Sequence, residues 1–581
     1  MNLAALFHQP FMEYREALPD GRVRIRLRSA REDNLAVTLL HVAIYKPARW
    51  EQRFSRSPMA KVSSTVLHDY YQADFIPDDP RLCYLFEIRQ GEALFYLDQE
   101  GIKTQEDFNT PPFGINPFAF AYAYPPKALP SWALGSVGYQ IFPDRFRRAG
   151  SPAEGCQPWH GGKVANDRFF GGDLVGIRQA IPYLKELGIT LVYLTPIFKA
   201  ATAHRYDTED YYKLDSRLGS FQDLKNLTDS LHREGMRLIL DGVFNHSGIR
   251  FAPFVDASSR PETSPYRDWF IFDDSKAGYQ TFAYTRLMPK LNLKNPDAAR
   301  FFLDVGRYWV REAGIDGWRL DVSPEVWPDF WRAFRRAIHQ ENHEALMIAE
   351  CWDDSREWVG MGDMFDGTIH YMLSRAIWRF LAMDELDLAG FDSAVHHALN
   401  LYPSARMGAQ WTYLSSHDTP RFLTRAGKKE DRLRLAAFFQ LTAPGLPIIY
   451  YGDELGMEGG EDPDCRRPMA WDRVNNNAIL AWYQQLTRLR LHLPALRTGS
   501  LMTHCLGPEG IYAYLRLDTQ PLLCVMCTGQ AIARQSLELP QAFKGASSLY
   551  DWLTGREVRI HQHQIELSVR PGACYILGRI P

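Results

Sequence analysis

Eight short apolar segments lie between residues 132 and 498, with amphipathic helical stretches between them. Most of these segments are largely apolar, as expected of parallel strands that are buried on both faces. Eight strands that alternate with helices predict a (β/α)8 TIM barrel. The predicted strands are 137–142, 189–194, 236–241, 317–322, 346–351, 365–371, 411–416 and 446–451.

Local signals place individual elements of this predicted barrel. Asn295 is a helix-capping residue, Pro296 suits the first helical position and Gly314 suits a helix end, so a helix is predicted over 297–313. Residues 247–293 are too many for an ordinary connection after the third strand. We expect them to form a small inserted subdomain.

Both flanks of the barrel are predicted to be β-structure. Residues 1–124 contain no long helical pattern, and 21–28 (GRVRIRLR) alternates apolar and basic residues as a half-exposed strand does. Together with the strand-like runs 35–45 and 83–89, this predicts an N-terminal β-sandwich. Pro125, Pro126 and Pro130 predict a linker before the barrel domain at 132–498. After a helix at 478–492, a second sandwich over 499–581 is expected from strands at 510–517, 522–527, 536–539 and 564–569.

The charge balance and the cysteine pattern exclude several classes of protein. The chain has 66 basic and 69 acidic residues, which gives no reason to expect nucleic acid or an anionic membrane as a partner. No apolar run is long enough for a transmembrane helix, and the first residues lack the basic segment of a signal peptide. Eight scattered cysteines suit a reduced, cytoplasmic protein. The lone CxxC pair, Cys524 and Cys527, is expected to pack rather than to bind metal.

Polar residues follow four of the predicted barrel strands, at the end where barrel active sites lie. Taken singly, each has a structural explanation: Asp241 could cap the next helix, and Arg319 could simply pair with Asp321. Packing does not explain why four strands deliver carboxylates and histidines to the same rim. The residues are Asp241, Asn245, His246, Arg319, Asp321, Glu350, His417 and Asp418.

This set suits glycoside hydrolysis with retention of configuration. One carboxylate attacks the anomeric carbon, and a second carboxyl about 5–5.5 Å away protonates the leaving oxygen and later deprotonates water. Arg319 lies two residues before Asp321, on the same strand face, and is expected to keep Asp321 ionised. Glu350 would then be the acid, and its neighbours are expected to raise its pKa.

These residues lie within motifs that resemble the α-amylase family of glycoside hydrolases. The motifs are DGVFNH (241–246), GWRLDV (317–322), AECW (349–352) and SSHDT (415–419), with YQIFPDRF (139–146), YDTEDY (206–211) and PGLPIIYYGDE (444–454) as further matches. The resemblance covers nearly the whole chain. MPKLN (288–292), DPDCRRPM (462–469) and the N-terminal sandwich are similar to the cyclomaltodextrinase, neopullulanase and maltogenic amylase group.

The resemblance assigns roles to the residues. Asp321 would be the nucleophile, Glu350 the acid/base, and Asp418 would hold substrate hydroxyls and stabilise the oxocarbenium-like state. Tyr206 would stack under the same sugar and Asp241 would support the site. That sugar would also contact His246, Arg319 and His417. The next sugar outward would bind to Asp464 and Arg467. The leaving-group side would contact Phe282, Trp352 and Tyr371, whose rings suit the C–H faces of sugars.

The resemblance also implies an activity. It points to a cytoplasmic enzyme that opens cyclodextrins and cleaves short α-1,4-linked maltodextrins, with transglycosylation and with pullulan as a further substrate. In that group the N-terminal sandwich serves dimerisation and covers the partner's site, so a homodimer is expected. A maltodextrin α-glucosidase and a neopullulanase remain alternatives. A non-enzymatic binding protein with an amylase-like barrel is disfavoured because Asp321, Glu350 and Asp418 are all present.

The chain departs from the family at one metal site. Many relatives bind calcium with an Asn- and Asp-rich loop after the first strand, whereas this chain has FRRAGSPAEGC (146–156). Arg147 and Arg148 bring positive charge to it, and among side chains only Glu154 and Asp173 could help to supply the about six to eight oxygens that calcium prefers. We therefore expect no calcium here, no other metal and no cofactor, and an arginine side chain could take the place of the ion.

Overall fold

The structure is a computed structural model that describes residues 1–44, 54–109, 115–121, 127–151, 154–507, 510–529 and 533–579. The predicted linker prolines Pro125 and Pro126, and Tyr45 at the end of a predicted strand, lie outside these residues. The chain divides into two compact units. The first comprises Met1–Ala128, Gly360–Gly362 and Leu386–Met407, and the second comprises Leu129–Val359, Asp363–Glu385 and Gly408–Pro581.

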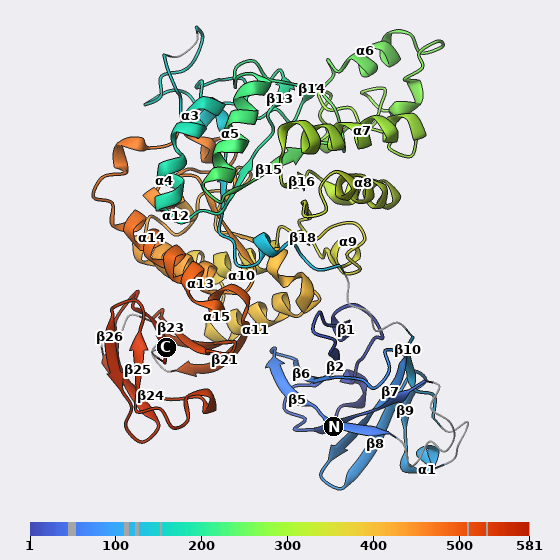
Figure 1. Ribbon diagram of the computed structural model, residues 1–581, viewed down its shortest axis with the longest axis vertical. Coiled ribbons are helices and arrows are strands. Elements are labelled where there is room, and N and C mark those ends of the chain that lie inside the picture. The colour runs from blue at the N-terminus through green and yellow to red at the C-terminus, as the bar shows by residue number, and fades with distance from the viewer. Residues whose placement is uncertain are drawn as a thin grey trace. The chain divides into compact units, whose positions relative to one another are not determined.

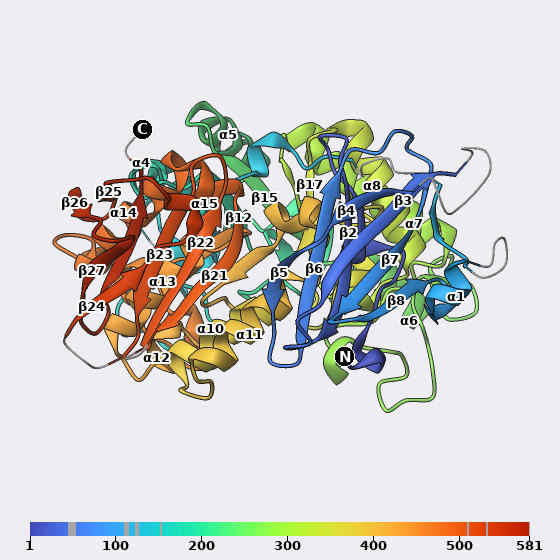
Figure 2. The same cartoon turned by 90° about the horizontal axis from the view of Figure 1, so that it is seen from below.

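The first unit contains the predicted N-terminal β-sandwich, whose strands are the blue ribbons of Figure 2. Side chains of both sheets, among them Ile25 and Phe86, form one buried core. One sheet has the order β1 (Arg15–Ala17), β2 (Val23–Ala30), β6 (His68–Phe75), β5 (Ala60–Ser64). The other has the order β4 (Ser55–Pro58), β3 (Ala36–Ala43), β7 (Leu82–Gln90), β8 (Ala93–Asp98), β9 (Gly101–Lys103), and β7 also pairs with β10 (Phe118–Phe120). The helices of this unit are α1 (Gln105–Phe108) and α11 (Leu388–Leu399).

The second unit contains the predicted barrel. Its eight strands are parallel, and a parallel bridge from Ile369 to Trp411 joins the two ends of the sheet. The eight expected strands are confirmed, although β18 spans two residues where seven were predicted. In sheet order they are β18 (Gly367–Thr368), β17 (Leu346–Ala349), β16 (Gly317–Leu320), β15 (Arg237–Gly242), β12 (Leu191–Leu194), β11 (Gly138–Ile141), β20 (Leu446–Tyr450) and β19 (Trp411–Tyr413).

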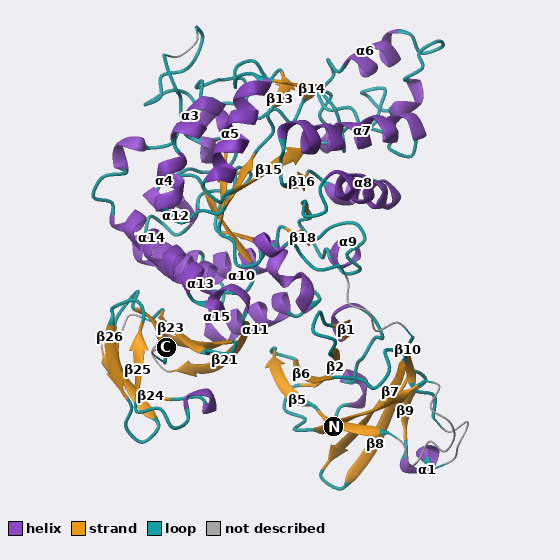
Figure 3. Ribbon diagram, in the orientation of Figure 1, coloured by secondary structure: helices purple, strands orange, loops and turns teal. Residues whose placement is uncertain are grey.

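Helices surround these strands (Figures 1 and 3). The predicted cap at α7 is confirmed: the Asn295 side chain accepts hydrogen bonds from the first turn, and the helix continues through a π-turn to Gly314, where φ is 72°. The helices are α2 (Pro143–Phe146), α3 (Leu174–Gln179), α4 (Ile181–Glu186), α5 (Phe221–Arg233), α6 (Ala252–Ser259), α7 (Pro296–Tyr308), α8 (Pro328–Glu341), α9 (Arg356–Val359), α10 (Tyr371–Ile377), α12 (Phe422–Arg425), α13 (Glu430–Thr442), α14 (Ala478–His492) and α15 (Pro494–Thr498).

A hairpin that was not predicted follows the second barrel strand. It consists of β13 (Phe198–Ala200) and β14 (Thr208–Leu214), with shifts in the pairing register. Its first strand is only three residues long and its second carries several charged residues, so neither shows the alternation that identifies a strand. The hairpin is important for the site because its loop carries Tyr206.

The C-terminal part of this unit is also β-structure. Cys524 and Cys527 lie buried in β23, where burial raises their thiol pKa values to about 12 and about 11. Side chains of two sheets share one core. The larger sheet has the order β21 (Ser500–Gly507), β22 (Ile511–Leu517), β23 (Leu522–Cys527), β28 (Cys574–Gly578), β25 (Ser548–Asp551), β26 (Arg556–Arg559), and the smaller one pairs β24 (Ala533–Glu538) with β27 (Gln564–Val569).

No helix within the described ranges is long and apolar enough to cross a membrane.

A buried carboxyl after β20, bonded to residues of β11 and α4, makes stability depend on pH. Glu454 accepts hydrogen bonds from the hydroxyls of Tyr139 (2.7 Å) and Tyr183 (2.6 Å), and burial raises its pKa to about 7. The folded chain therefore holds this proton more tightly than the unfolded chain does. The contribution of Glu454 to stability falls as pH rises from about 4.5 to about 7.

The Glu454→Gln variant should lack this decrease in the free energy of unfolding, of about 3 kcal/mol, when both proteins are titrated with denaturant across this pH range. The same slope in both proteins would contradict the assignment, and Glu458→Gln is the partly exposed control.

Candidate active site

The predicted catalytic side chains meet at the carboxyl end of the barrel strands. Asp241 lies near the end of β15, Arg319 lies in β16, and Asp321 follows β16 directly. Glu350 follows β17. None of these four residues is more than 5% exposed. Because the strands are parallel and in register, residues far apart in sequence are brought to one rim.

Arg319 holds three carboxylates at once. Its Nη1 donates to Asp241 Oδ1 (2.8 Å) and to Asp321 Oδ1 (2.7 Å), and its Nη2 lies 2.8 Å from Glu350 Oε1. A planar guanidinium has donors in fixed directions, so it sets the positions of the carboxylates around it. Asp321 and Glu350 are therefore fixed relative to each other through a single side chain.

This cluster has three carboxyl groups, Asp241, Asp321 and Glu350, and one positively charged group, Arg319. Burial raises the pKa of Asp321 well above its ordinary value, the negative charge of Glu350 raises it further, and Arg319 only opposes the rise. Burial likewise raises the pKa of Asp241 to about 6. The sequence predicted that Arg319 would keep Asp321 ionised; in the structure the effect of burial on the pKa of Asp321 exceeds that of Arg319. Three carboxylates cannot all stay ionised around one cation without strong repulsion, so the cluster favours keeping one proton.

The backbone after β16 positions Glu350. Val322 has φ 45° and ψ 45°, a left-handed conformation that is strained for a β-branched residue. In this conformation its N–H donates to Glu350 Oε2 at 2.9 Å, while Trp352 Nε1 donates to Oε1 at 3.2 Å. Both oxygens of Glu350 are thus held in defined directions before any substrate binds.

A second group of side chains joins the cluster from β19 and the β13–β14 loop. Tyr206 donates its hydroxyl proton to Asp241 Oδ2 (2.9 Å), and its ring is parallel to that of His417, with centroids 5.5 Å apart. Gln140 donates to His417 Nδ1 (2.7 Å), which assigns the ring proton to Nε2, 3.1 Å from Asp418 Oδ2. Burial, reinforced by Arg466 and Arg319, lowers the pKa of His417 well below its ordinary value, so the ring is neutral.

His246 and Phe282 form a stacked pair of rings in the candidate site. Their rings stack with centroids 4.7 Å apart and planes 14° apart. Burial lowers the pKa of His246 to about 3, so this imidazole is neutral as well. Its buried Nε2 has no hydrogen-bond partner among the described residues. An unpaired buried nitrogen is costly, and a substrate hydroxyl would satisfy it.

Trp352 and Tyr371 form a stacked pair beside Glu350. Their ring centroids are 3.9 Å apart and the rings are nearly parallel, at 11°. Tyr371 is buried, whereas Trp352 is 37% exposed. The pair therefore presents one indole to solvent next to the predicted acid, as an aromatic platform for a sugar would require.

Asp464 and Arg467 do not bond to the carboxylate cluster. They pair with each other (2.6 Å) and line a separate cavity of about 610 Å³. Arg466, one of the two residues between them, connects the two places: its Nε donates to the His417 carbonyl (2.7 Å), and its Nη2 donates to Asp418 Oδ1 (3.2 Å).

Four residues that bond to this site were not singled out from the sequence. Gln140 and Tyr193 lie inside apolar strands, where a polar group looks like part of the core, yet Tyr193 donates to Asp241 Oδ2 at 2.5 Å. Arg466 belongs to the DPDCRRPM motif, but the sequence alone assigned it no role. Lys290 of MPKLN bonds to Asn245 and donates to the Glu325 carbonyl (2.7 Å), which ties the 247–293 segment to the loop after β16.

The loop after β11 does not fit a calcium ion. Both carboxylate oxygens of Asp173 accept backbone N–H bonds, from Gly176 (2.6 Å) and Ala149 (3.1 Å), as a helix cap does. The Arg147 guanidinium lies over the Trp471 ring. Glu154 is exposed, and no group of three or more His, Cys, Asp or Glu residues in the described part of the chain is arranged to hold a metal. The carboxylate oxygens of Asp173 are thus already engaged, and Arg147 brings a positive charge to the loop.

Removal of metal ions by a chelator should therefore have little effect on activity or thermal stability. We expect treatment with EDTA followed by desalting to leave the initial rate and the Tm unchanged, because no ion holds this loop. Loss of activity that returns on adding calcium, and not on adding magnesium, would show that this prediction is wrong.

The sequence matches two domain families. Residues 140–487 match "Alpha amylase, catalytic domain" and residues 1–124 match "Alpha amylase, N-terminal ig-like domain".

Relatives match over nearly the full length. Neopullulanase 2 of Thermoactinomyces vulgaris is 37% identical over 98% of each chain, and a cyclomaltodextrinase of Geobacillus thermopakistaniensis is 38% identical over 98% of each. Intracellular maltogenic amylase of Bacillus subtilis is 32% identical over 100% of this chain and 99% of its own. A solved structure of a cyclomaltodextrinase superposes with a TM-score of 0.92, at 34% identity and with 100% of both chains covered.

Proposed function

The chain belongs to the alpha-amylase family, and within that family of glycoside hydrolases we propose that it is a retaining enzyme that opens cyclomaltodextrins and cleaves α-1,4 bonds of short linear maltodextrins. The observation that carries the proposal is the pair Asp321 and Glu350, both held by the guanidinium of Arg319.

In the proposed first step, the Asp321 carboxylate attacks the anomeric carbon while Glu350 donates its proton to the glycosidic oxygen. The bond to the leaving sugar breaks and a glycosyl ester forms on Asp321. For this step Asp321 acts as the anion, which the hydrogen bond from Arg319 stabilises, and Glu350 supplies the proton.

In the second step, Glu350 removes a proton from water, which attacks the same carbon and releases Asp321. A sugar hydroxyl in place of water gives transglycosylation. The exposed indole of Trp352 beside Glu350 supports this, because it offers a binding surface for an acceptor sugar.

The remaining predicted residues hold the substrate. Asp418 would bind the hydroxyls of the reacting sugar and stabilise the positive charge that develops on it. Tyr206 would stack under that sugar, and Asp241 would hold Arg319 in place by accepting its hydrogen bonds. The same sugar would contact His246, Arg319 and His417. Asp464 and Arg467 would bind the next sugar outward. The leaving-group side would contact Phe282, Trp352 and Tyr371.

A homodimer in the cytoplasm is part of the proposal. It is supported by the match of residues 1–124 to an N-terminal family domain and by a relative that is named intracellular. Sedimentation should give twice the 66.8 kDa chain mass at micromolar concentration. A chain that stays monomeric there would contradict the dimer and leave the catalytic proposal standing.

The substrate is tested by comparing initial rates on β-cyclodextrin, soluble starch and pullulan. The proposal predicts a rate on the cyclodextrin at least about tenfold above that on starch, because a narrow site admits rings and short chains better than polymers. Starch as the fastest substrate would indicate an open cleft and a general amylase. Pullulan as the fastest would favour the neopullulanase alternative, which the name of one relative also suggests.

A further inference from the structure

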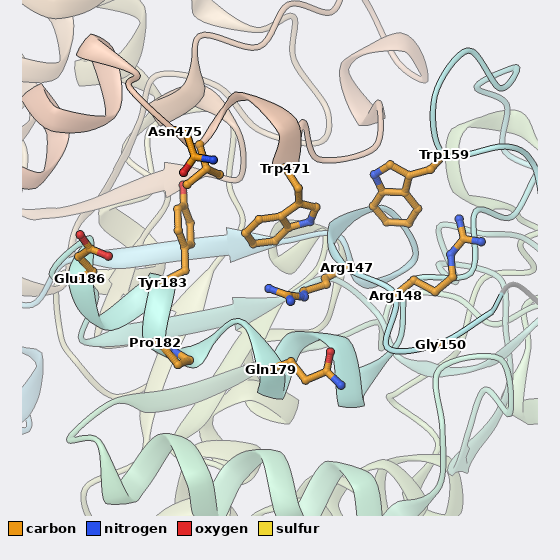
Figure 4. A pocket seen from close by; sticks show the side chains of 11 residues that line it. Arg147, Arg148, Gly150, Trp159, Gln179, Pro182, Tyr183, Glu186, Trp471 and Asn475 are labelled. Carbon is orange, nitrogen blue, oxygen red and sulfur yellow. The ribbon is translucent and has the colours of Figure 1, made fainter.

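A second groove lies in the same unit as the barrel, and none of the catalytic carboxylates lines it. Its volume is about 760 Å³. It is formed by the loop after β11, by α3 and α4, and by the loop after β20. Figure 4 shows three aromatic side chains, Tyr183, Trp471 and Trp159, one after another across it, with Arg147, Arg148 and Gln179 below them.

The aromatic rings are fixed through their polar ends. Trp471 Nε1 donates to the Phe146 carbonyl (2.6 Å) and Trp159 Nε1 donates to the Met469 carbonyl (2.9 Å), which also accepts from the Trp471 backbone N–H (3.1 Å). The ring centroids of Tyr183 and Trp471 are 5.2 Å apart. Because the polar atoms are already bonded, these rings offer ordered apolar surface without a cost for ordering it on binding.

Each of the two arginines lies over an aromatic ring, and neither pairs with a carboxylate of the described residues. Arg147 lies 5.0 Å from the Trp471 ring centroid and Arg148 lies 5.2 Å from that of Trp159. Neither forms a hydrogen bond or an ion pair through its guanidinium with any described residue. A guanidinium that lies over a ring and has no carboxylate partner keeps N–H groups that can donate to paired hydroxyls.

The rest of the lining suits a neutral ligand better than an anion. Gln179 and Asn475 contribute amides, which donate and accept, and Glu186 contributes a carboxylate to the same groove. A phosphate would gain from the arginines and lose from Glu186. Aromatic surface together with mixed donors and acceptors matches a sugar, which presents C–H faces and pairs of hydroxyls.

Trp159 connects this groove to the predicted substrate path. It also lines the cavity of about 610 Å³ that contains Asp464 and Arg467, the residues predicted to bind the sugar outward of the reacting one. A linear chain that leaves the catalytic centre past Asp464 would therefore reach the indole that forms one wall of the second groove.

We propose that the groove lined by Trp159, Trp471, Tyr183, Arg147 and Arg148 is a second binding site for linear α-glucan chains. The identity of the ligand rests on the proposed function. The site takes no part in bond cleavage, so it binds chains that extend beyond the catalytic centre or a second glucan molecule.

The test fills the groove without removing a packed side chain. Gln179 is exposed on α3, so Gln179→Trp places an indole in the groove, and Arg178→Trp places one on the same helix outside it. Calorimetric titration with maltotriose in a Glu350→Gln background should show a class of sites whose affinity falls at least tenfold in Gln179→Trp and is kept in Arg178→Trp. Arg148→Ala should weaken the same class.

Identical isotherms for Gln179→Trp and Arg178→Trp would overturn the proposal. So would inorganic phosphate that binds in the groove while maltotriose does not, because that result would mean an anion site. Activity of the unmodified enzyme on β-cyclodextrin is measured in parallel. If it is present while the groove shows no binding, only the second site fails; if it is absent while groove binding is seen, only the proposed function fails.

Discussion

Replacing Asp321 by Asn is expected to lower kcat on β-cyclodextrin by at least about 10⁴-fold, because the amide cannot form the glycosyl ester. The substitution keeps the shape of the side chain and removes one negative charge from a cluster in which three carboxylates share Arg319. The protein should therefore fold, and KM should change far less than kcat.

The matched control is at the other end of the same strand. Asp316 precedes β16 and pairs with His232 and Arg237, away from the carboxyl rim. Asp316→Asn should cost stability and leave kcat within about threefold, since this end of a barrel serves stability. If both variants lost activity equally, the loss would reflect folding, and Asp321 would not be assigned as the nucleophile.

Replacing Arg319 by Met is expected to destabilise the protein by about 3–5 kcal/mol near neutral pH and to abolish activity. Three buried carboxylates would lose the cation that they share, and the pKa values of Asp321 and Asp241 would rise further. Carboxyls whose pKa is higher in the folded chain bind protons more tightly there, so stability falls as pH rises above about 4. The deficit should therefore be small at about pH 5 and largest at about pH 8.

Denaturant titrations of both proteins across this pH range check the prediction. Arg490→Met is the control, because Arg490 is equally buried and donates to the carbonyls of Leu441, Ala443 and Gly445 instead of to carboxylates. Its deficit should not change with pH. A pH-independent deficit in Arg319→Met would mean that the carboxylates do not depend on this guanidinium.

The barrel was predictable because its strands carry the pattern that burial on both faces imposes, as in 346–351 and 446–451. The cap at Asn295 and the end of the helix at Gly314 were predictable from local chemistry alone. The β13–β14 hairpin was not, since a three-residue strand with a shifted register carries too little pattern. Pairing of β24 with β27 in a separate sheet depends on contacts distant in sequence.

The position of the site residues was predictable for a geometric reason: parallel strands end at one rim. The way in which Arg319 binds Asp241, Asp321 and Glu350 together was not, because spacing shows only that Arg319 and Asp321 share a strand face. The left-handed conformation of Val322 leaves no trace in the sequence. Likewise, the degree of burial that raises the pKa of Asp321 exists only after folding.

The central claim is that Asp321 becomes glycosylated while Glu350 serves as acid and base. Mass spectrometry of Glu350→Gln after incubation with α-maltosyl fluoride tests it most directly. Fluoride leaves without a proton, so the first step proceeds without Glu350, while the second lacks its base and the intermediate accumulates. We predict a maltosyl group on the peptide that contains Asp321. Release of fluoride with no adduct, or an adduct on another residue, would contradict the account.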